Sequence, residues 1–162
     1  MKKSNGLKFV VAVMIAHTAG YLVSGEISYQ LITKDLWEGP DPLLASYLRT
    51  PGDPGLWTFA MVWQIPAQLV RSLLMGLVLL PFRQPLMEWS FLKRAFFMAG
   101  LLFVFTHLAA SAPSPANLEG AVYLKPEFVK QGFWIIQPEM VLYSLVGGFV
   151  FSKLTLRKAA AT

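Results

Sequence analysis

The sequence predicts an all-helical integral membrane protein in which four transmembrane helices form one bundle, with residues 1–162 as a single membrane domain. Two observations lead to this fold class. The chain is 55% hydrophobic and 14% charged, whereas charged residues make up about a quarter of an ordinary soluble domain. In addition, four apolar segments approach or exceed the roughly 20 residues that a helix needs to cross a bilayer.

The predicted transmembrane helices cover residues 9–31, 56–80, 95–112 and 132–152. Loops 32–55 and 113–131 connect them on one side of the membrane, and loop 81–94 connects them on the other. In the first loop, Asp41 and Pro42 predict the start of a short helix over residues 42–49, because Asp favours the N-cap and Pro the first helical position. We interpret this segment as a packed connector, and a lid over the mouth of the bundle is the alternative.

The basic residues indicate how the chain lies in the membrane. One side carries Lys2, Lys3, Lys8, Arg83, Lys93, Arg94, Lys153, Arg157 and Lys158, and the other carries only Lys34, Arg49, Lys125 and Lys130. Because the side richer in Lys and Arg generally faces the cytoplasm, we expect a multi-pass protein of the cell (inner) membrane with both termini inside. The net charge is +5, but the basic residues form no face with interleaved aromatic residues, which argues against a nucleic-acid partner.

The first apolar segment has a second interpretation, because lysines precede Phe9–Ile15 as they do in a secretory signal peptide. Against cleavage, His17 and Thr18 interrupt the apolar run, no A-x-A site follows, and the apolar segment continues through Leu31. We therefore favour a retained first helix. Cleavage would leave three helices and an external N-terminus.

The second and fourth apolar segments show a weak internal similarity. When Pro66 is aligned with Pro138, the residues that coincide are Ser72 with Ser144, Leu73 with Leu145 and Gly76 with Gly148. The two histidines, His17 and His107, lie in the first and third segments. Two hairpins that run in the same direction would be parallel repeats, as in some transporters, and the short match leaves repeated and unrelated hairpins equally open.

Polar residues inside the apolar segments predict a buried site. An arginine within a transmembrane helix is costly without a partner, and Arg71 lies inside the second segment. At 1.5 Å per helical residue, Arg71, His107 and Glu139 lie roughly 18, 20 and 21 Å from the cytoplasmic basic residues, whereas His17 lies at roughly 13–14 Å. Gln64 and Gln68 share the helical face of Arg71, which we expect to point into the bundle. The predicted site residues are therefore Arg71, Glu139, His107, Gln68, Gln64 and Glu26, with Glu139 as the partner of Arg71 and Glu26 at the rim.

These residues favour a membrane protein that binds or passes a small polar or anionic species. In this hypothesis Arg71 recognises the anion, and Glu139 is the titrating or charge-balancing carboxylate. Four helices are few for a carrier, so we expect a homo-oligomer or other membrane subunits as partners, besides the lipid bilayer. The alternative is an accessory or structural subunit of a membrane complex, in which the polar layer serves packing only.

A second alternative is a protein that binds b-type haem through His17 and His107, whose estimated depths differ by roughly 6 Å. No other cofactor is expected. The chain has no cysteine, which excludes thiolate metal sites, and it contains neither H-E-x-x-H nor G-x-S-x-G. We therefore predict no metal site and no catalytic residue, and an enzyme is the less favoured class.

Overall fold

The computed structural model describes residues 4–40, 43–46, 48–110 and 114–155. These residues form helices and irregular connections without a strand, and four of the helices are long and apolar enough to cross a membrane. The predicted all-helical, multi-pass fold is confirmed at this level. The predicted helix start at Asp41 and Pro42 lies outside the described residues, whereas Leu43–Ser46 (η2) forms a short 3-10 helix.

The first long helix continues beyond its predicted end at residue 31. Helix α1 (Ser4–Ser28) passes through a π-helical segment, η1 (Tyr29–Thr33), directly into α2 (Lys34–Glu38). The helix then ends at Gly39, whose backbone is extended with ψ of 175°. The next residue is Pro40, and a residue before proline disfavours the helical conformation.

The other long helices lie close to their predicted positions. Helix α3 (Pro54–Leu79) begins at Asp53, whose carboxylate accepts hydrogen bonds from two backbone N–H groups of the first turn. A 3-10 turn, η3 (Leu80–Phe82), and α4 (Arg83–Glu88) connect it to α5 (Phe91–Phe103), which continues as the π-helical segment η4 (Val104–Leu108). The short α6 (Leu118–Tyr123) precedes α7 (Pro126–Leu154). Pro66 in α3 and Pro138 in α7 interrupt neither helix.

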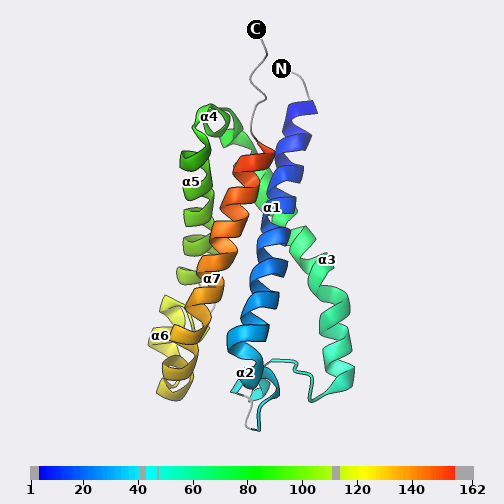
Figure 1. Cartoon of the computed structure of the whole chain (residues 1–162), viewed down its shortest axis with the longest axis vertical. Coiled ribbons are helices and arrows are strands. Elements are labelled where there is room, and N and C mark those ends of the chain that lie inside the picture. Colours follow the sequence, from blue (N-terminus) through cyan, green and yellow to red (C-terminus); the bar gives the residue numbers. More distant parts are fainter. Residues whose placement is uncertain (1–3, 41–42, 47, 111–113, 156–162) are drawn as a thin grey trace.

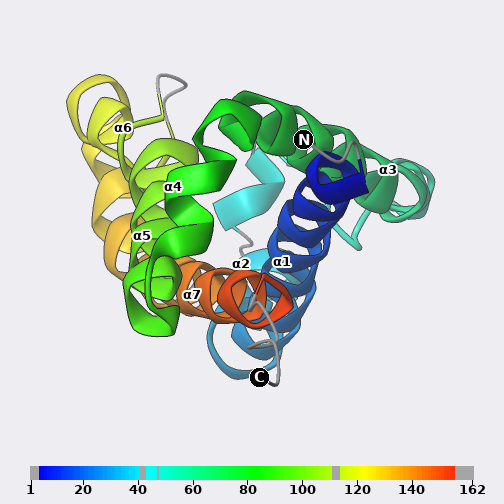
Figure 2. The ribbon, with the colours of Figure 1, turned by 90° about the horizontal axis from the view of Figure 1, so that it is seen from above.

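The long helices pack side by side in the order α3, α1, α7, α5 (Figures 1 and 2). Helix α7 makes extensive contacts with both α1 and α5, and α1 also packs against α3. By contrast, α3 and α5 barely touch. Neighbouring helices therefore pack at three interfaces, which we call seams. The fourth seam, between α3 and α5, is open.

The two ends of the bundle differ in what covers them. The N-terminal end of α1 and the C-terminal end of α7 lie at the end of the bundle that carries α4 (Figure 1). We call this the α4 end. There the buried Arg94 donates to the Thr155 carbonyl at 2.9 Å, and the Ser152 hydroxyl donates to the Phe91 carbonyl at 2.6 Å. The opposite end, with α2 and α6, is called the α2 end. Seen from the α4 end, the cyan segment that includes η2 lies within the outline of the long helices (Figure 2).

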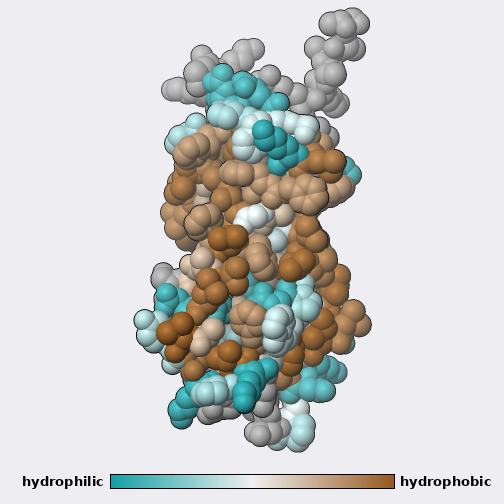
Figure 3. Space-filling model, turned by 90° about the vertical axis from the view of Figure 1, so that its left-hand side faces the viewer, coloured by the Kyte–Doolittle hydropathy of each residue, from teal (hydrophilic) through white to brown (hydrophobic). Residues whose placement is uncertain are grey.

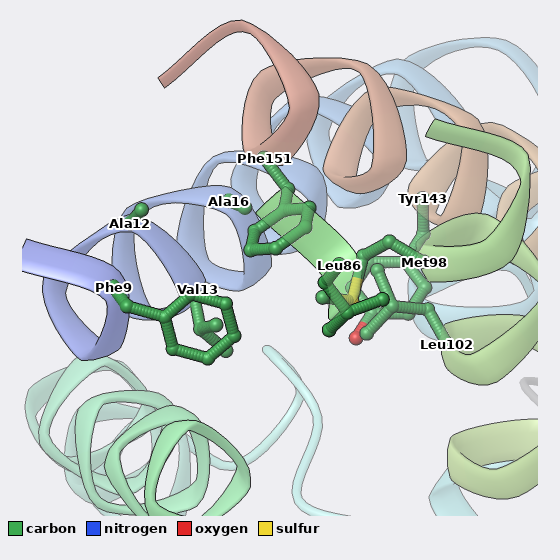
Figure 4. Packing of buried hydrophobic residues seen from close by; sticks show 9 residues of the cluster. All are labelled: Phe9, Ala12, Val13, Ala16, Leu86, Met98, Leu102, Tyr143 and Phe151. Atoms are coloured by element: carbon green, nitrogen blue, oxygen red, sulfur yellow. The ribbon is translucent and has the colours of Figure 1, made fainter. Parts of the chain in front are cut away.

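Glycines allow the helices to approach closely. A Cβ atom on Gly148 of α7 would lie 2.2 Å from the Ala95 carbonyl oxygen of α5, and one on Gly20 of α1 would lie 2.7 Å from the Tyr143 carbonyl oxygen of α7. Apolar side chains fill the interior beside these contacts. Phe9 and Phe151 pack edge to face with their ring centroids 5.7 Å apart, next to the other core residues drawn in Figure 4.

The outer surface of the long helices is apolar. Val78, Phe105 and Phe96 are 71%, 69% and 65% exposed, respectively. In the face shown in Figure 3, apolar residues form a broad band with hydrophilic residues at both ends, and a further hydrophilic patch lies within the lower half of the band. Such a band suits contact with lipid rather than with water.

Candidate functional site

His17 is the centre of a hydrogen-bond network that joins three of the long helices. Its imidazole in α1 is 2% exposed. The Nδ1 atom lies 2.6 Å from the hydroxyl of Tyr143 in α7, and Nε2 lies 2.8 Å from Oε1 of Gln68 in α3. Because an amide oxygen only accepts, Nε2 carries a proton and Nδ1 accepts the hydroxyl proton of Tyr143. A neutral imidazole therefore has both of its nitrogens satisfied.

A second tier of polar residues lies one helical turn nearer to the α2 end. Each member stands four residues from a member of the His17 network on the same helix: Tyr21 from His17, Gln64 from Gln68, and Glu139 from Tyr143. The Tyr21 hydroxyl donates to Oε1 of Gln64 at 3.4 Å, and it lies within electrostatic range of both Glu139 and Arg71. Three helices thus contribute two stacked polar tiers to the interior of the bundle.

Arg71 occupies a different position from these tiers. It lies three residues beyond Gln68 toward the α4 end, and its side chain is exposed at the open seam, within electrostatic range of His17 and Tyr143. One guanidinium nitrogen donates to the Thr106 carbonyl in η4 at 3.3 Å, and this is its one hydrogen bond among the described residues. Thr106 lies near the end of its helix, where carbonyls lack intrahelical partners and a cation is favoured by the helix dipole.

The predicted ion pair between Arg71 and Glu139 is not formed among the described residues. The cause is their depth: Arg71 lies about one turn from the His17 network toward the α4 end, and Glu139 lies one turn away toward the α2 end. Two turns separate the residues by roughly 11 Å along the bundle. The half-buried Glu139 instead lies near the buried hydroxyl of Ser28 in α1.

Two other predicted site residues lie outside the polar tiers. Nε2 of His107 lies 3.2 Å from Oε1 of Gln137, whose own amide nitrogen donates to the Ala116 carbonyl at 2.7 Å. This second network ties η4 and α7 to the segment before α6. Glu26 is exposed and accepts a hydrogen bond from Gln30 on its own helix at 3.0 Å. The structure therefore brings together Gln64, Gln68 and Glu139, and it places Arg71 beside them.

Sequence reasoning missed His17, Tyr21 and Tyr143 as members of this interior. A depth counted from Lys8 puts His17 too near the α4 end, because α1 already begins at Ser4 and His17 is level with Gln68 and Tyr143. The tyrosines resemble ordinary core or interfacial aromatic residues. The spacing of four residues between polar side chains on each of three segments is the signal that identifies the two tiers.

A cavity of about 460 Å³ opens between α3 and α5. Arg71 and Thr106 lie at the end of this cavity that is nearer to the α2 end, and the rest of the lining is apolar. The apolar residues are Leu74, Met75, Val78, Leu79, Met98, Leu101 and Phe105. We call this space the α3–α5 cleft. It coincides with the seam at which the helices barely touch.

No protein-family model, curated protein or solved structure matches this chain. Its function is therefore inferred from the geometry of the site.

The geometry also bears on the haem and metal alternatives. Both ring nitrogens of His17 form hydrogen bonds, so His17 would have to lose one of them to bind haem iron. His107 is likewise hydrogen-bonded to Gln137. The part of the chain that the structure describes contains no group of three or more His, Cys, Asp or Glu residues that could hold a metal ion.

Tyr143→Phe tests whether the His17 network stabilises the bundle. This change removes the hydroxyl that donates to Nδ1 of His17 and keeps the aromatic ring. We expect the free energy of unfolding in mixed micelles to fall by about 0.5–1.5 kcal/mol, the range found for interhelical hydrogen bonds in membranes. Tyr123→Phe is the matched control, because the Tyr123 side chain is 72% exposed. Equal stability of the two variants would contradict a structural role for the network.

Proposed function

We propose that this chain is a multi-pass membrane protein that binds or passes a small anionic species at Arg71. The observation that supports this proposal most strongly is the environment of the guanidinium. It lies within a candidate membrane-spanning helix, borders the α3–α5 cleft and contacts one backbone carbonyl. Arginine keeps its charge in proteins, and a carbonyl supplies no neutralising charge. An anion from outside the chain provides the missing countercharge.

The polar tiers extend this site into the bundle. The amide oxygen of Gln68 accepts the hydrogen bond from His17. The NH₂ group of Gln68 has two donors, of which one serves the Tyr21 hydroxyl and the other is available to a ligand. Both donors lie about one helical turn from Arg71. Glu139 lies one turn further toward the α2 end, where its carboxylate would balance charge or exchange a proton as an anion passes.

The accessory-subunit hypothesis is supported by a different observation. The hydrogen bonds of His17 join α1, α3 and α7 directly, as expected of polar groups that serve packing. In this second candidate function, the countercharge of Arg71 is a carboxylate on a neighbouring membrane subunit or on another copy of the chain. The two hypotheses differ in whether the isolated protein binds a dissolved anion.

We also propose that the α4 end faces the cytoplasm of a cell with an inner membrane. The support is the distribution of basic residues, since Arg83, Lys93, Arg94 and Lys153 lie at the α4 end. Two parallel helical hairpins are part of the same proposal. In each hairpin, a histidine of the first helix bonds to a glutamine of the second, namely His17 to Gln68 and His107 to Gln137.

Arg71→Gln tests the proposed function. Equilibrium dialysis of the protein in nanodiscs with radiolabelled propionate and phosphate is expected to show binding of at least one anion. Arg71→Gln should weaken this binding at least about tenfold, which corresponds to about 1.4 kcal/mol, and Arg71→Lys should retain most of it. Arg49→Gln is the control, because Arg49 stacks on the Phe59 ring, away from the cleft. Binding of neither anion, or equal binding by wild type and Arg71→Gln, would refute the proposal.

The orientation can be measured by labelling single cysteines, since the natural chain has none. Gln84→Cys places an exposed thiol at the α4 end, and Ala121→Cys places one at the α2 end. In intact spheroplasts, a membrane-impermeant maleimide should label Ala121→Cys and should label Gln84→Cys only after lysis. The reverse pattern would show that the α4 end faces outward.

A further inference from the structure

The α3–α5 cleft has one charged end and one apolar end. Arg71 and Thr106 form the charged end, and the lining changes to aliphatic and methionine side chains within one helical turn. The cleft extends along α3 from Arg71 to Leu79, a length of roughly 12 Å at 1.5 Å per residue. A cation at one end of an apolar channel complements a ligand that has an anionic head and a hydrocarbon chain.

The charged end of the cleft carries one cation, so it takes one anionic head. The cleft has a volume of about 460 Å³ and a length of roughly 12 Å, and it holds the first part of one hydrocarbon chain. A longer chain continues past Leu79 into the bilayer, because the cleft is open to lipid.

The cleft opens sideways toward the bilayer. Leu74, Val78 and Phe105, which line it, are 57%, 71% and 69% exposed. The flanking helices α3 and α5 barely touch, so no packed seam blocks lateral entry. A ligand that is already dissolved in the bilayer therefore reaches Arg71 without crossing the polar ends of the bundle.

The apolar lining by itself does not select a ligand in a membrane, because lipid tails are as apolar as leucine. Selectivity has to come from Arg71, which distinguishes an acid from an uncharged molecule of the same length. A strongly hydrated anion would lose its water beside Leu74 and Met75 without compensation. A carboxylate at the end of a hydrocarbon chain loses water too, but its pairing with Arg71 compensates, and its chain rather than a hydrated group lies beside Leu74 and Met75.

We propose that the α3–α5 cleft binds a single-chain acidic amphiphile from the bilayer, with its carboxylate at Arg71 and its chain along α3 toward Leu79. This inference rests on the proposed anion-binding role of Arg71 and names the class of its ligand. The ligand enters from the membrane, and its head lies beside the donors of Gln68 at the edge of the polar tiers.

The test uses electron spin resonance of stearic acid with a nitroxide at carbon 5, in phosphatidylcholine vesicles that contain the full-length protein. Its methyl ester is the matched uncharged probe. The measured quantity is the motionally restricted fraction of each probe. At alkaline pH, where the carboxyl is ionised, we expect wild type to favour the acid over the ester about fivefold by this measure. Arg71→Gln should bring this ratio close to one, and Arg71→Lys should restore it.

Two tryptophan variants locate the site while Arg71 stays in place. Val78→Trp fills the cleft and should lower the acid preference. Leu77→Trp places the same ring on a neighbouring position that is 50% exposed and outside the cleft lining, and it should leave the preference unchanged. An equal effect of both variants would overturn the placement of the chain in the cleft.

Equal restriction of acid and ester in wild type would overturn the inference. If propionate still binds in an Arg71-dependent manner in that case, the proposed function stands with a water-soluble ligand, and only the amphiphile is excluded. If propionate and phosphate also fail to bind, both proposals fall. If the acid preference is absent and Arg71→Gln dissociates a dimer in the vesicles, a second copy of the chain occupies the cleft instead, which also overturns the inference.

Discussion

The imidazole of His17 is the interaction on which the interior of this bundle depends. In a membrane a polar group finds its partners within the protein, and His17 obtains both of its partners from neighbouring helices. One short side chain on α1 thereby sets the relative depth of Gln68 on α3 and Tyr143 on α7. The second tier follows from the first, because Tyr21, Gln64 and Glu139 each lie one turn away on the same three helices.

The contrast between His17 and Arg71 connects this structure to function. The His17 network is complete, whereas the guanidinium of Arg71 has five donors and one hydrogen bond among the described residues. The fourth seam, between α3 and α5, remains open at the level where this cation lies. The accessory-subunit hypothesis needs a carboxylate from a neighbouring subunit at this seam. The anion-binding role that we propose needs only a ligand to account for both the charge and the opening.

Much of the fold follows from simple properties of the sequence, and less of the site does. Apolar segments of sufficient length predict four helices. They do not predict that α1 continues into α2 until Gly39 and Pro40 end the helix. The sequence identifies Arg71, Gln68 and Gln64 as candidate site residues, because polar groups are rare in such segments. Which residues meet is set by the relative depth and rotation of the helices, and close glycine contacts such as Gly20 with Tyr143 determine these. Depth counted from the flanking basic residues errs by a turn or more, enough to replace the predicted partner Glu139 by the Thr106 carbonyl.

The central claim is that Arg71 is an intramembrane cation that receives its countercharge from a ligand. The most direct measurement is the Nε–Hε resonance of Arg71 in uniformly ¹⁵N-arginine-labelled protein in nanodiscs, assigned by its loss in Arg71→Lys. Saturable titration with a carboxylate should shift this resonance, because a carboxylate forms charge-assisted hydrogen bonds with the guanidinium. The resonances of Arg49 and Arg83 should stay in place. An Arg71 resonance that does not respond to carboxylate, or that moves only in parallel with those of the other arginines, would contradict the account.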